Sequence, residues 1–124
     1  MEYRTFGKSG VKASLFGIGC MRLPLLQAAG GSTSNGKIDE AAAIRMIRHG
    51  IDQGVTYIDT AWGYHEGTSE ALVGQALRGG YREKVSLATK LPTWLTFKYE
   101  DFSRYLDAQL ERLGTDHIDF YLLH

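Results

Sequence analysis

The chain has 124 residues, of which 44% are hydrophobic, and this predicts a single domain over residues 1–124 with a buried core. Lys and Arg together number 14, as do Asp and Glu, so the formal net charge is zero. This balance argues against binding to nucleic acid or to a membrane surface, because both need a basic excess.

The termini and apolar runs give no sign of export or of membrane insertion. No apolar run approaches the roughly 18 residues of a membrane span, and residues 1–4 lack the apolar segment of a secretory signal. Cys20 is the single cysteine, so the chain forms no internal disulfide and no cysteine-rich metal site. We therefore expect a cytoplasmic protein in which Cys20 is a small buried residue rather than a reactive thiol.

The first third of the chain mixes turn residues with one apolar run. Weak alternation on both sides of the turn at 7–10 predicts a hairpin within residues 3–12 that covers one end of the fold. Residues 14–19 read as a strand. The segment 27–36 is rich in Gly, Ser, Ala and Asn without periodicity, and we expect it to be mobile.

Apolar residues then recur at helical spacing in three stretches, each ended by glycine. Helices are expected from Glu40 to Gly54, from about Thr68 to the pair Gly79–Gly80, and from about Tyr99 to Gly114. Asp39 is placed to cap the first. The inward-facing residues are expected to be Ile44, Ile47 and Ile51 in the first helix, Leu72, Val73, Ala76 and Leu77 in the second, and Phe102, Leu106, Leu110 and Leu113 in the third.

Further strand-like runs separate these helices, beginning at Val55, Lys84 and Ile118. Strict alternation of strand and helix predicts a parallel α/β sheet with right-handed crossovers. A closed (β/α) barrel of the TIM type needs about 250 residues. The predicted fold class is therefore the first half of such a barrel, with about four strands and three helices after an N-terminal hairpin.

Polar residues follow three of the predicted strands. Asp59 and Tyr64 come after one strand, Lys90 ends the next, and His124 follows the last. Each alone is more readily explained as a loop or surface residue, but the carboxyl ends of parallel strands meet on one face, so jointly they predict a shared site.

Several neighbouring residues have less specific readings. Trp62 and Trp94 flank the expected site, either as an apolar substrate wall or as packing at its rim. His65 lacks partner ligands at metal-binding spacing, so it is expected to be a surface loop residue, and no metal site is predicted.

Four spaced motifs, which together extend over the whole chain, resemble the aldo-keto reductase family. They also follow one another in the order in which that family has them. They are Tyr3–Gly7 with Gly17–Pro24, Asp59–Tyr64 with Ser69–Glu70, Ala88–Lys90, and Asp116–His124. The resemblance implies the N-terminal half of an eight-stranded barrel, with a catalytic tetrad of Asp59, Tyr64, Lys90 and His124. It also implies NADPH as cofactor and places Cys20, Met21, Arg22 and Asp59 near it.

The implied reaction is reduction of an aldehyde or ketone substrate by hydride transfer. Tyr64 is expected to donate the proton, because the positive charge of Lys90 can lower the pKa of a phenol that is otherwise near 10. Asp59 would hold Lys90 in its charged form, and His124 would donate a hydrogen bond to the carbonyl oxygen. The hydride itself must come from the nicotinamide.

A second reading from another class stays open. The 124 residues could be a truncated half-barrel without catalysis of its own, which self-associates through the exposed edges of its sheet. We expect weak or no activity from this piece alone. The motifs after the first and third strands resemble a subgroup in which many members carry a ferredoxin-like 4Fe-4S segment near the C-terminus, and such a cluster would belong only to a part beyond His124.

Overall fold

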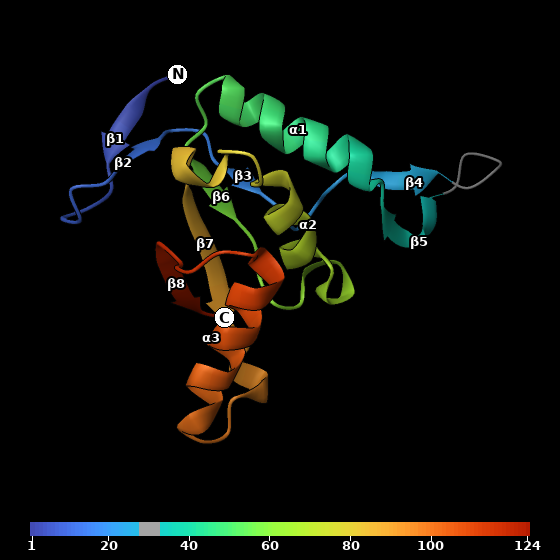
Figure 1. Ribbon diagram of the computed structural model, residues 1–124, viewed down its shortest axis with the longest axis vertical. Coiled ribbons are helices and arrows are strands. Elements are labelled where there is room, and N and C mark those ends of the chain that lie inside the picture. Colours follow the sequence, from blue (N-terminus) through green and yellow to red (C-terminus); the bar gives the residue numbers. More distant parts are fainter. Residues whose placement is uncertain (28–32) are drawn as a thin grey trace.

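The computed structural model describes residues 1–27 and 33–124, which form a four-stranded parallel sheet, two antiparallel hairpins and three α-helices. The sheet has the strand order β3 (Ile18–Gly19), β6 (Tyr57–Asp59), β7 (Ser86–Leu91), β8 (Phe120–Leu123) (Figure 1). The four strands follow one another across the sheet in their order along the chain, although β4 and β5 lie between β3 and β6 in sequence, so the sheet progresses in one direction like the wall of a barrel. The predicted half-barrel is confirmed, although β3 is much shorter than expected.

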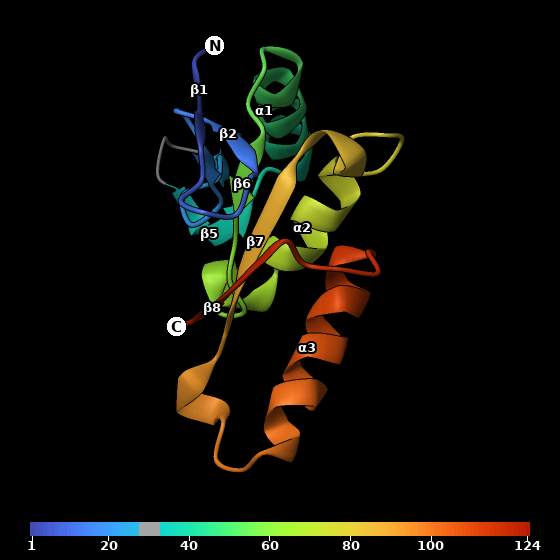
Figure 2. The same cartoon turned by 90° about the vertical axis from the view of Figure 1, so that its left-hand side faces the viewer.

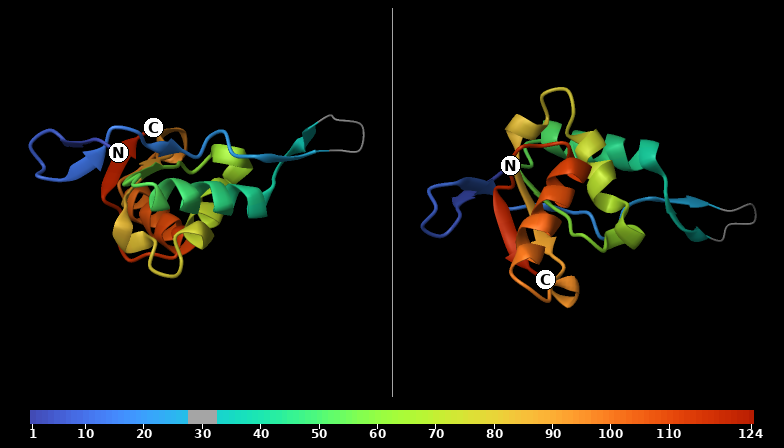
Figure 3. Two further views of the ribbon diagram at one scale, coloured as in Figure 1. Left: turned by 90° about the horizontal axis from the view of Figure 1, so that it is seen from above. Right: turned by 60° about the horizontal axis from the view of Figure 1, so that its bottom comes forward.

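The three α-helices cover one face of this sheet (Figure 2, Figure 3). They are α1 (Glu40–Asp52), α2 (Ser69–Ala76) and α3 (Glu100–Leu113), and short 3₁₀ turns occupy η1 (Tyr64–Gly67), η2 (Arg82–Lys84) and η3 (Thr93–Leu95). The opposite face of the sheet carries no helix of the described residues. That face corresponds to the interior of a barrel.

Local sequence explains where α1 begins and ends. The carboxylate of Asp39 accepts a hydrogen bond from the Ala42 N–H at 2.9 Å, which confirms the predicted N-cap. Ile47 and Ile51 are buried as expected. Gly54, with φ +97°, adopts a left-handed conformation that suits glycine and turns the chain toward β6.

The expected apolar face of α3 is only partly correct. Leu113 is buried, but Phe102 is 45% exposed, whereas the polar residues Asp101 and Gln109 are almost fully buried. The difference arises because Gln109 hydrogen-bonds to residues of α2 and β7, whereas Asp101 accepts from the backbone N–H groups of Phe97 and Lys98. Spacing of apolar residues alone therefore did not reveal the burial of Asp101 and Gln109.

Helices α2 and α3 approach each other very closely at Gly74. A Cβ atom at this position would lie 2.5 Å from the carbonyl oxygen of Leu113. Because the obstacle is backbone, only glycine permits this packing.

The segment after Pro24 contains two strands that were not predicted. Residues β4 (Leu25–Gln27) and β5 (Thr33–Ile38) pair as an antiparallel hairpin. Gln27 and residues 33–36 belong to these strands, which the sequence did not predict, and 28–32 lie outside the described residues; the expected mobility of 27–36 stays a prediction. Backbone pairing formed here without the alternating apolar pattern that identifies most strands.

The N-terminal hairpin closes one end of the sheet, as predicted. Strands β1 (Tyr3–Thr5) and β2 (Lys12–Ser14) pair antiparallel. Phe6, which follows β1, packs its ring against Phe120 at 4.5 Å and against Tyr57 at 5.9 Å, measured between ring centroids. This aromatic cluster fills the inner face near the amino ends of β6 and β8.

Alternation along the strands directs side chains to opposite faces. Leu87 and Thr89 of β7 are fully buried on the helical side. Ala88 is in register with Asp59, and Lys90 with Leu122, so these side chains share the inner face. The charged groups of the sheet therefore lie toward the barrel interior, near the carboxyl ends of the strands.

Candidate active site

Three strands and one turn bring Asp59, Tyr64, Lys90 and His124 together. Asp59 is the last residue of β6, Lys90 lies one residue before the end of β7, and His124 directly follows β8. Tyr64 begins the η1 turn after β6. The expected convergence of these four side chains at the carboxyl ends of the strands is what the structure shows.

Lys90 is the centre of this group. Its ammonium Nζ donates to Asp59 Oδ1 at 2.5 Å and to the carbonyl oxygen of Thr60 at 2.8 Å. The side chains of Lys90 and Asp59 are only 13% and 26% exposed, so water screens the pair weakly. Burial alone would lower the pKa of Lys90, but hydrogen bonding to Asp59 and then to Tyr64 outweighs burial, and the pKa is raised above 10.5.

The aromatic rings of Tyr64 and His124 complete the group. Lys90 Nζ lies 4.8 Å from the centroid of the Tyr64 ring, and the His124 ring stands edge-on to Tyr64 with centroids 5.8 Å apart. The backbone N–H of His124 donates to Leu91 O at 3.2 Å, which fixes His124 to the end of β7. A phenol, an ammonium and an imidazole thus surround one small region.

The two tryptophans take different places. Trp94 is 50% exposed and its ring lies 5.4 Å from that of His124, so it borders the site. Trp62 instead packs edge-on against Tyr105 at 5.0 Å and beneath the Arg112 guanidinium at 3.5 Å, which ties it to α3. Of the two tryptophans, Trp94 is therefore the one whose position agrees with the expected apolar wall of a substrate site.

The three residues after β3 differ in accessibility. Cys20 is fully buried, and burial first and the charge of Asp59 second raise the pKa of its thiol to about 12. The reading of Cys20 as a small buried residue is confirmed, while its expected place next to a cofactor stays a prediction. Met21 is 48% exposed and Arg22 is exposed, and both line a groove of about 420 Å³ that Tyr64 also lines.

A buried polar network behind β7 was missed by sequence reasoning. The Glu70 carboxylate is completely buried and accepts hydrogen bonds from Thr89 at 2.7 Å, Gln109 at 2.6 Å and Arg112 at 3.2 Å. Gln109 also donates to the Lys90 carbonyl oxygen at 3.1 Å. The network thus holds the backbone of Lys90 from the helical side.

Ser69 has a similar supporting role beside the loop after β3. Its hydroxyl bonds to Thr60 Oγ1 at 2.9 Å and donates to the Cys20 carbonyl oxygen at 3.0 Å. The adjacent residues Ser69 and Glu70 of the second motif were the sequence signal for the Ser69 contacts and for the buried network around Glu70. From the sequence alone, this pair was noted only for its resemblance to the family motif and was assigned no structural role.

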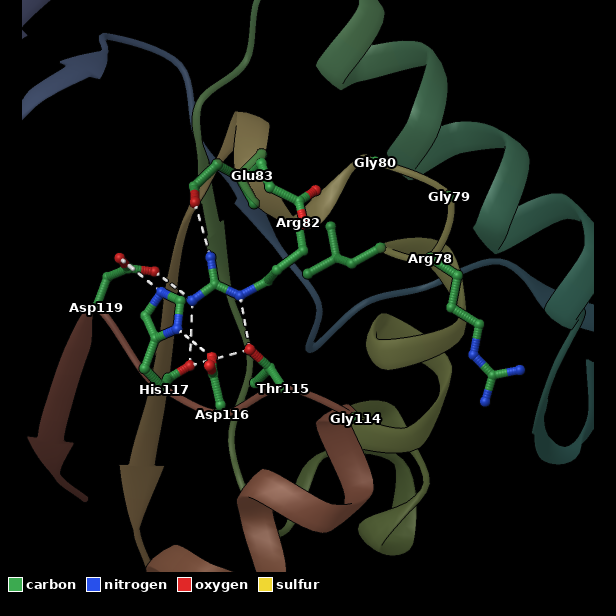
Figure 4. A pocket seen from close by; sticks show the side chains of 12 residues that line it. Arg78, Gly79, Gly80, Arg82, Glu83, Gly114, Thr115, Asp116, His117 and Asp119 are labelled. Carbon is green, nitrogen blue, oxygen red and sulfur yellow. Dashed lines mark hydrogen bonds and ion pairs between the residues drawn. The ribbon is translucent and has the colours of Figure 1, made fainter.

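A second groove of about 470 Å³ lies at the opposite, amino ends of β7 and β8 (Figure 4). Arg82 crosses it and donates to the carbonyl oxygens of Val85 and His117, to Thr115 Oγ1 and to Asp119 Oδ2, the last at 2.7 Å. The guanidinium therefore makes four hydrogen bonds to protein acceptors. This cluster ties the starts of two strands together rather than presenting a free charge.

Two further observations bound the kinds of site available in residues 1–27 and 33–124. No group of three or more His, Cys, Asp or Glu side chains there could hold a metal ion. Within the same ranges, every helix is too short or too polar to cross a membrane.

The fold and the polar cluster define the class first: half of a (β/α)₈ barrel with its charged residues at the carboxyl ends of the strands, where enzymes of this fold place their active sites. Residues 17–124 match the model of the Aldo/keto reductase family. The chain belongs to that family, which confirms the resemblance seen in the motifs.

Relatives and a solved structure agree with this assignment. The chain is 38% identical to the aldo-keto reductase YhdN of Bacillus subtilis, covering 100% of this chain and 38% of the relative. It is 42% identical to the methylglyoxal reductase YeaE of Escherichia coli, over 76% of this chain and 31% of that protein. An aldo-keto reductase of Klebsiella pneumoniae, solved with NADPH, superimposes with a TM-score of 0.76 and 34% identity, over 100% of this chain and 40% of its own. The chain therefore spans less than half the length of the proteins it matches.

Proposed function

We propose that this chain forms the first half of the barrel of an NADPH-dependent oxidoreductase that reduces aldehydes or ketones to alcohols. The observation that carries the proposal is the partly buried Lys90 ammonium, held by Asp59 at 2.5 Å and lying against the Tyr64 ring. A methylglyoxal reductase and an NADPH complex among similar proteins support the carbonyl substrate and the cofactor.

In this proposal Tyr64 is the general acid. Its phenol donates a proton to the substrate oxygen as negative charge develops there, and the Lys90 ammonium stabilises the phenolate that remains. Asp59 keeps Lys90 charged and fixed, because their hydrogen bond is charge-assisted and weakly screened. In the reverse direction, the same phenolate removes the proton from an alcohol.

His124 and Trp94 orient the substrate. The imidazole lies beside Tyr64, which supports a role in which its N–H donates to the same carbonyl oxygen. The exposed ring of Trp94 offers an apolar surface next to it.

The residues present fit a nicotinamide dinucleotide. Arg22 offers positive charge for a phosphate and Met21 offers apolar surface, and both line the groove that also includes Tyr64. Met21, Arg22 and Asp59 would hold the cofactor on this side, and when bound it supplies the hydride.

The test uses the complete protein encoded by the reading frame. NADPH consumption with a simple aldehyde is measured for the wild type, for Lys90→Met and for the control Lys84→Met, whose lysine is half exposed and pairs only loosely with Asp52 at 3.8 Å. We expect Lys90→Met to lose at least about 100-fold in kcat and Lys84→Met to lose little. Equal turnover in the two variants would refute the proposal.

A second candidate applies to the 124-residue chain by itself: an inactive half-barrel that self-associates. It is favoured by the exposure of Leu123, at 74%, and of Phe16, at 63%. These exposed side chains leave apolar surface uncovered near both edges of the sheet. Sedimentation of the purified chain with and without NADPH tests it. A monomer that reduces aldehydes would exclude it, while a dimer indifferent to nucleotide would support it. A cytoplasmic location stays a prediction from the sequence, and so does the restriction of any 4Fe-4S cluster to a part beyond His124.

A further inference from the structure

The turn after Tyr64 has an unusual backbone. His65 (φ 51°, ψ 49°) and Glu66 (φ 56°, ψ 32°) are both left-handed, and they are the only non-glycine residues with positive φ in the described part of the chain. Gly67 continues the turn with φ +88°. Residues that carry a Cβ avoid this region, so tertiary contacts must hold the turn in place.

Contacts to the His65 side chain and carbonyl oxygen hold it. The imidazole Nε2 accepts a hydrogen bond from the backbone N–H of Leu23 at 3.2 Å, across 42 residues of sequence. The carbonyl oxygen of His65 accepts from both the N–H and the hydroxyl of Thr68, at 3.1 Å and 2.7 Å. For Nε2 to accept, the ring must be neutral with its proton on Nδ1.

This hydrogen bond joins two parts of the proposed site. Leu23 is buried and ends the loop that carries Met21 and Arg22, whereas His65 directly follows Tyr64. Both loops line the same groove. The bond from Leu23 to His65 is therefore a direct link between the Tyr64 turn and the loop proposed to hold the cofactor.

We infer that His65 is a positioning residue: its imidazole fixes the Tyr64 turn against the loop after β3 and so sets the phenol relative to the bound cofactor. The inference rests on the proposed function. It replaces the expectation that His65 is an ordinary surface residue, because the side chain is half-buried and engaged. A displacement of about 1 Å of a reacting group can cost 100-fold in rate, so a single well-placed hydrogen bond is enough to matter.

Two substitutions separate the hydrogen bond from the backbone conformation. The side-chain oxygen of glutamine can reach the position of Nε2, but glutamine tolerates the left-handed region poorly. Asparagine tolerates that region well, but its shorter side chain does not reach the Leu23 N–H. If the acceptor matters, His65→Gln outperforms His65→Asn, and if only the backbone matters, the order reverses.

The experiment measures kcat, cofactor affinity and hydrogen exchange of the Leu23 amide in the complete protein. We expect His65→Asn to lower kcat about tenfold with little change in cofactor affinity, and His65→Gln to stay within about threefold. Exchange protection at Leu23 should be kept in the glutamine variant and lost in the asparagine variant. The exposed histidine of α1, as His49→Asn, is the matched control and should leave kcat unchanged.

Each outcome of this experiment either supports or overturns the positioning role of His65. If His65→Asn fails to fold, His65→Gly replaces it, because glycine adopts the turn without strain and lacks the acceptor; the same tenfold loss is expected. An asparagine or glycine variant as active as wild type, or lost Leu23 protection with unchanged kcat, overturns the inference while leaving Tyr64 as proton donor. A wild type that reduces no carbonyl refutes the proposed function instead.

Discussion

Replacing Gln109 by methionine probes the buried network that supports Lys90. Gln109 is fully buried on α3, donates to Glu70 Oε1 at 2.6 Å and to Lys90 O at 3.1 Å, and accepts from the Tyr121 hydroxyl at 2.7 Å. Methionine has a similar length and no donor. The substitution therefore removes the polar contacts without opening a large cavity.

The expected cost follows from two of these bonds. A hydrogen bond to a charged carboxylate contributes about 1.5–3 kcal/mol, and a buried carbonyl left without a partner costs about 1–3 kcal/mol. Burial of the methionine side chain offsets about 1 kcal/mol. The free energy of unfolding should fall by about 3 kcal/mol, which lowers Tm by roughly 10 °C in a domain of this size.

Urea and thermal unfolding of the purified protein measure this effect. The matched control is Gln75→Met, which makes the same chemical change at an exposed position of α2 and should change stability by less than about 0.5 kcal/mol. If Gln109→Met unfolded at the same urea concentration as this control, the network would not be a source of stability.

Three other perturbations have defined outcomes. Gly74→Ala should cost about 2 kcal/mol because its Cβ meets backbone of α3, whereas in Gly50→Ala the Cβ meets the end of a flexible side chain and should cost less; equal unfolding midpoints would contradict this. Cys20, with its pKa raised to about 12 by burial, should resist alkylation at mildly alkaline pH and react fully in denaturant; rapid native alkylation would contradict its burial. The backbone N–H groups of Phe97 and Lys98, just before α3, donate to Asp101 and lower the pKa of its carboxyl below 3.8, so its stabilising contribution is present above that pH and is lost as pH falls through the lowered pKa. Asp101→Asn should therefore be less stable than wild type at neutral pH and equal in strong acid, and a difference independent of pH would contradict it.

The sequence was sufficient for the parts of the fold that depend on regular patterns. Alternation of strands and helices gave the parallel half-barrel, and the position of Asp59, Lys90 and His124 after successive strands gave their convergence, because strand direction alone decides which ends meet. Asp39 indicated the start of α1, because an aspartate is a preferred N-cap residue.

Features that depend on particular tertiary partners could not be predicted from the sequence. Gln109 looks like a surface residue of α3, because nothing in helical spacing distinguishes a solvated amide from one that meets a buried carboxylate. His65 acquires its role only where the chain returns beside Leu23. The hairpin of β4 and β5 forms from residues with weak strand preference, since backbone pairing with a neighbour can override local propensity.

The central claim is that Tyr64 donates the proton in a site organised by Lys90. The most direct measurement compares wild type and Tyr64→Phe in the complete protein, following NADPH binding by fluorescence and aldehyde reduction by NADPH consumption. Because phenylalanine keeps the ring and removes only the hydroxyl, reduction should fall by at least about 100-fold while NADPH binding is retained. Reduction at the wild-type rate by Tyr64→Phe would contradict the claim.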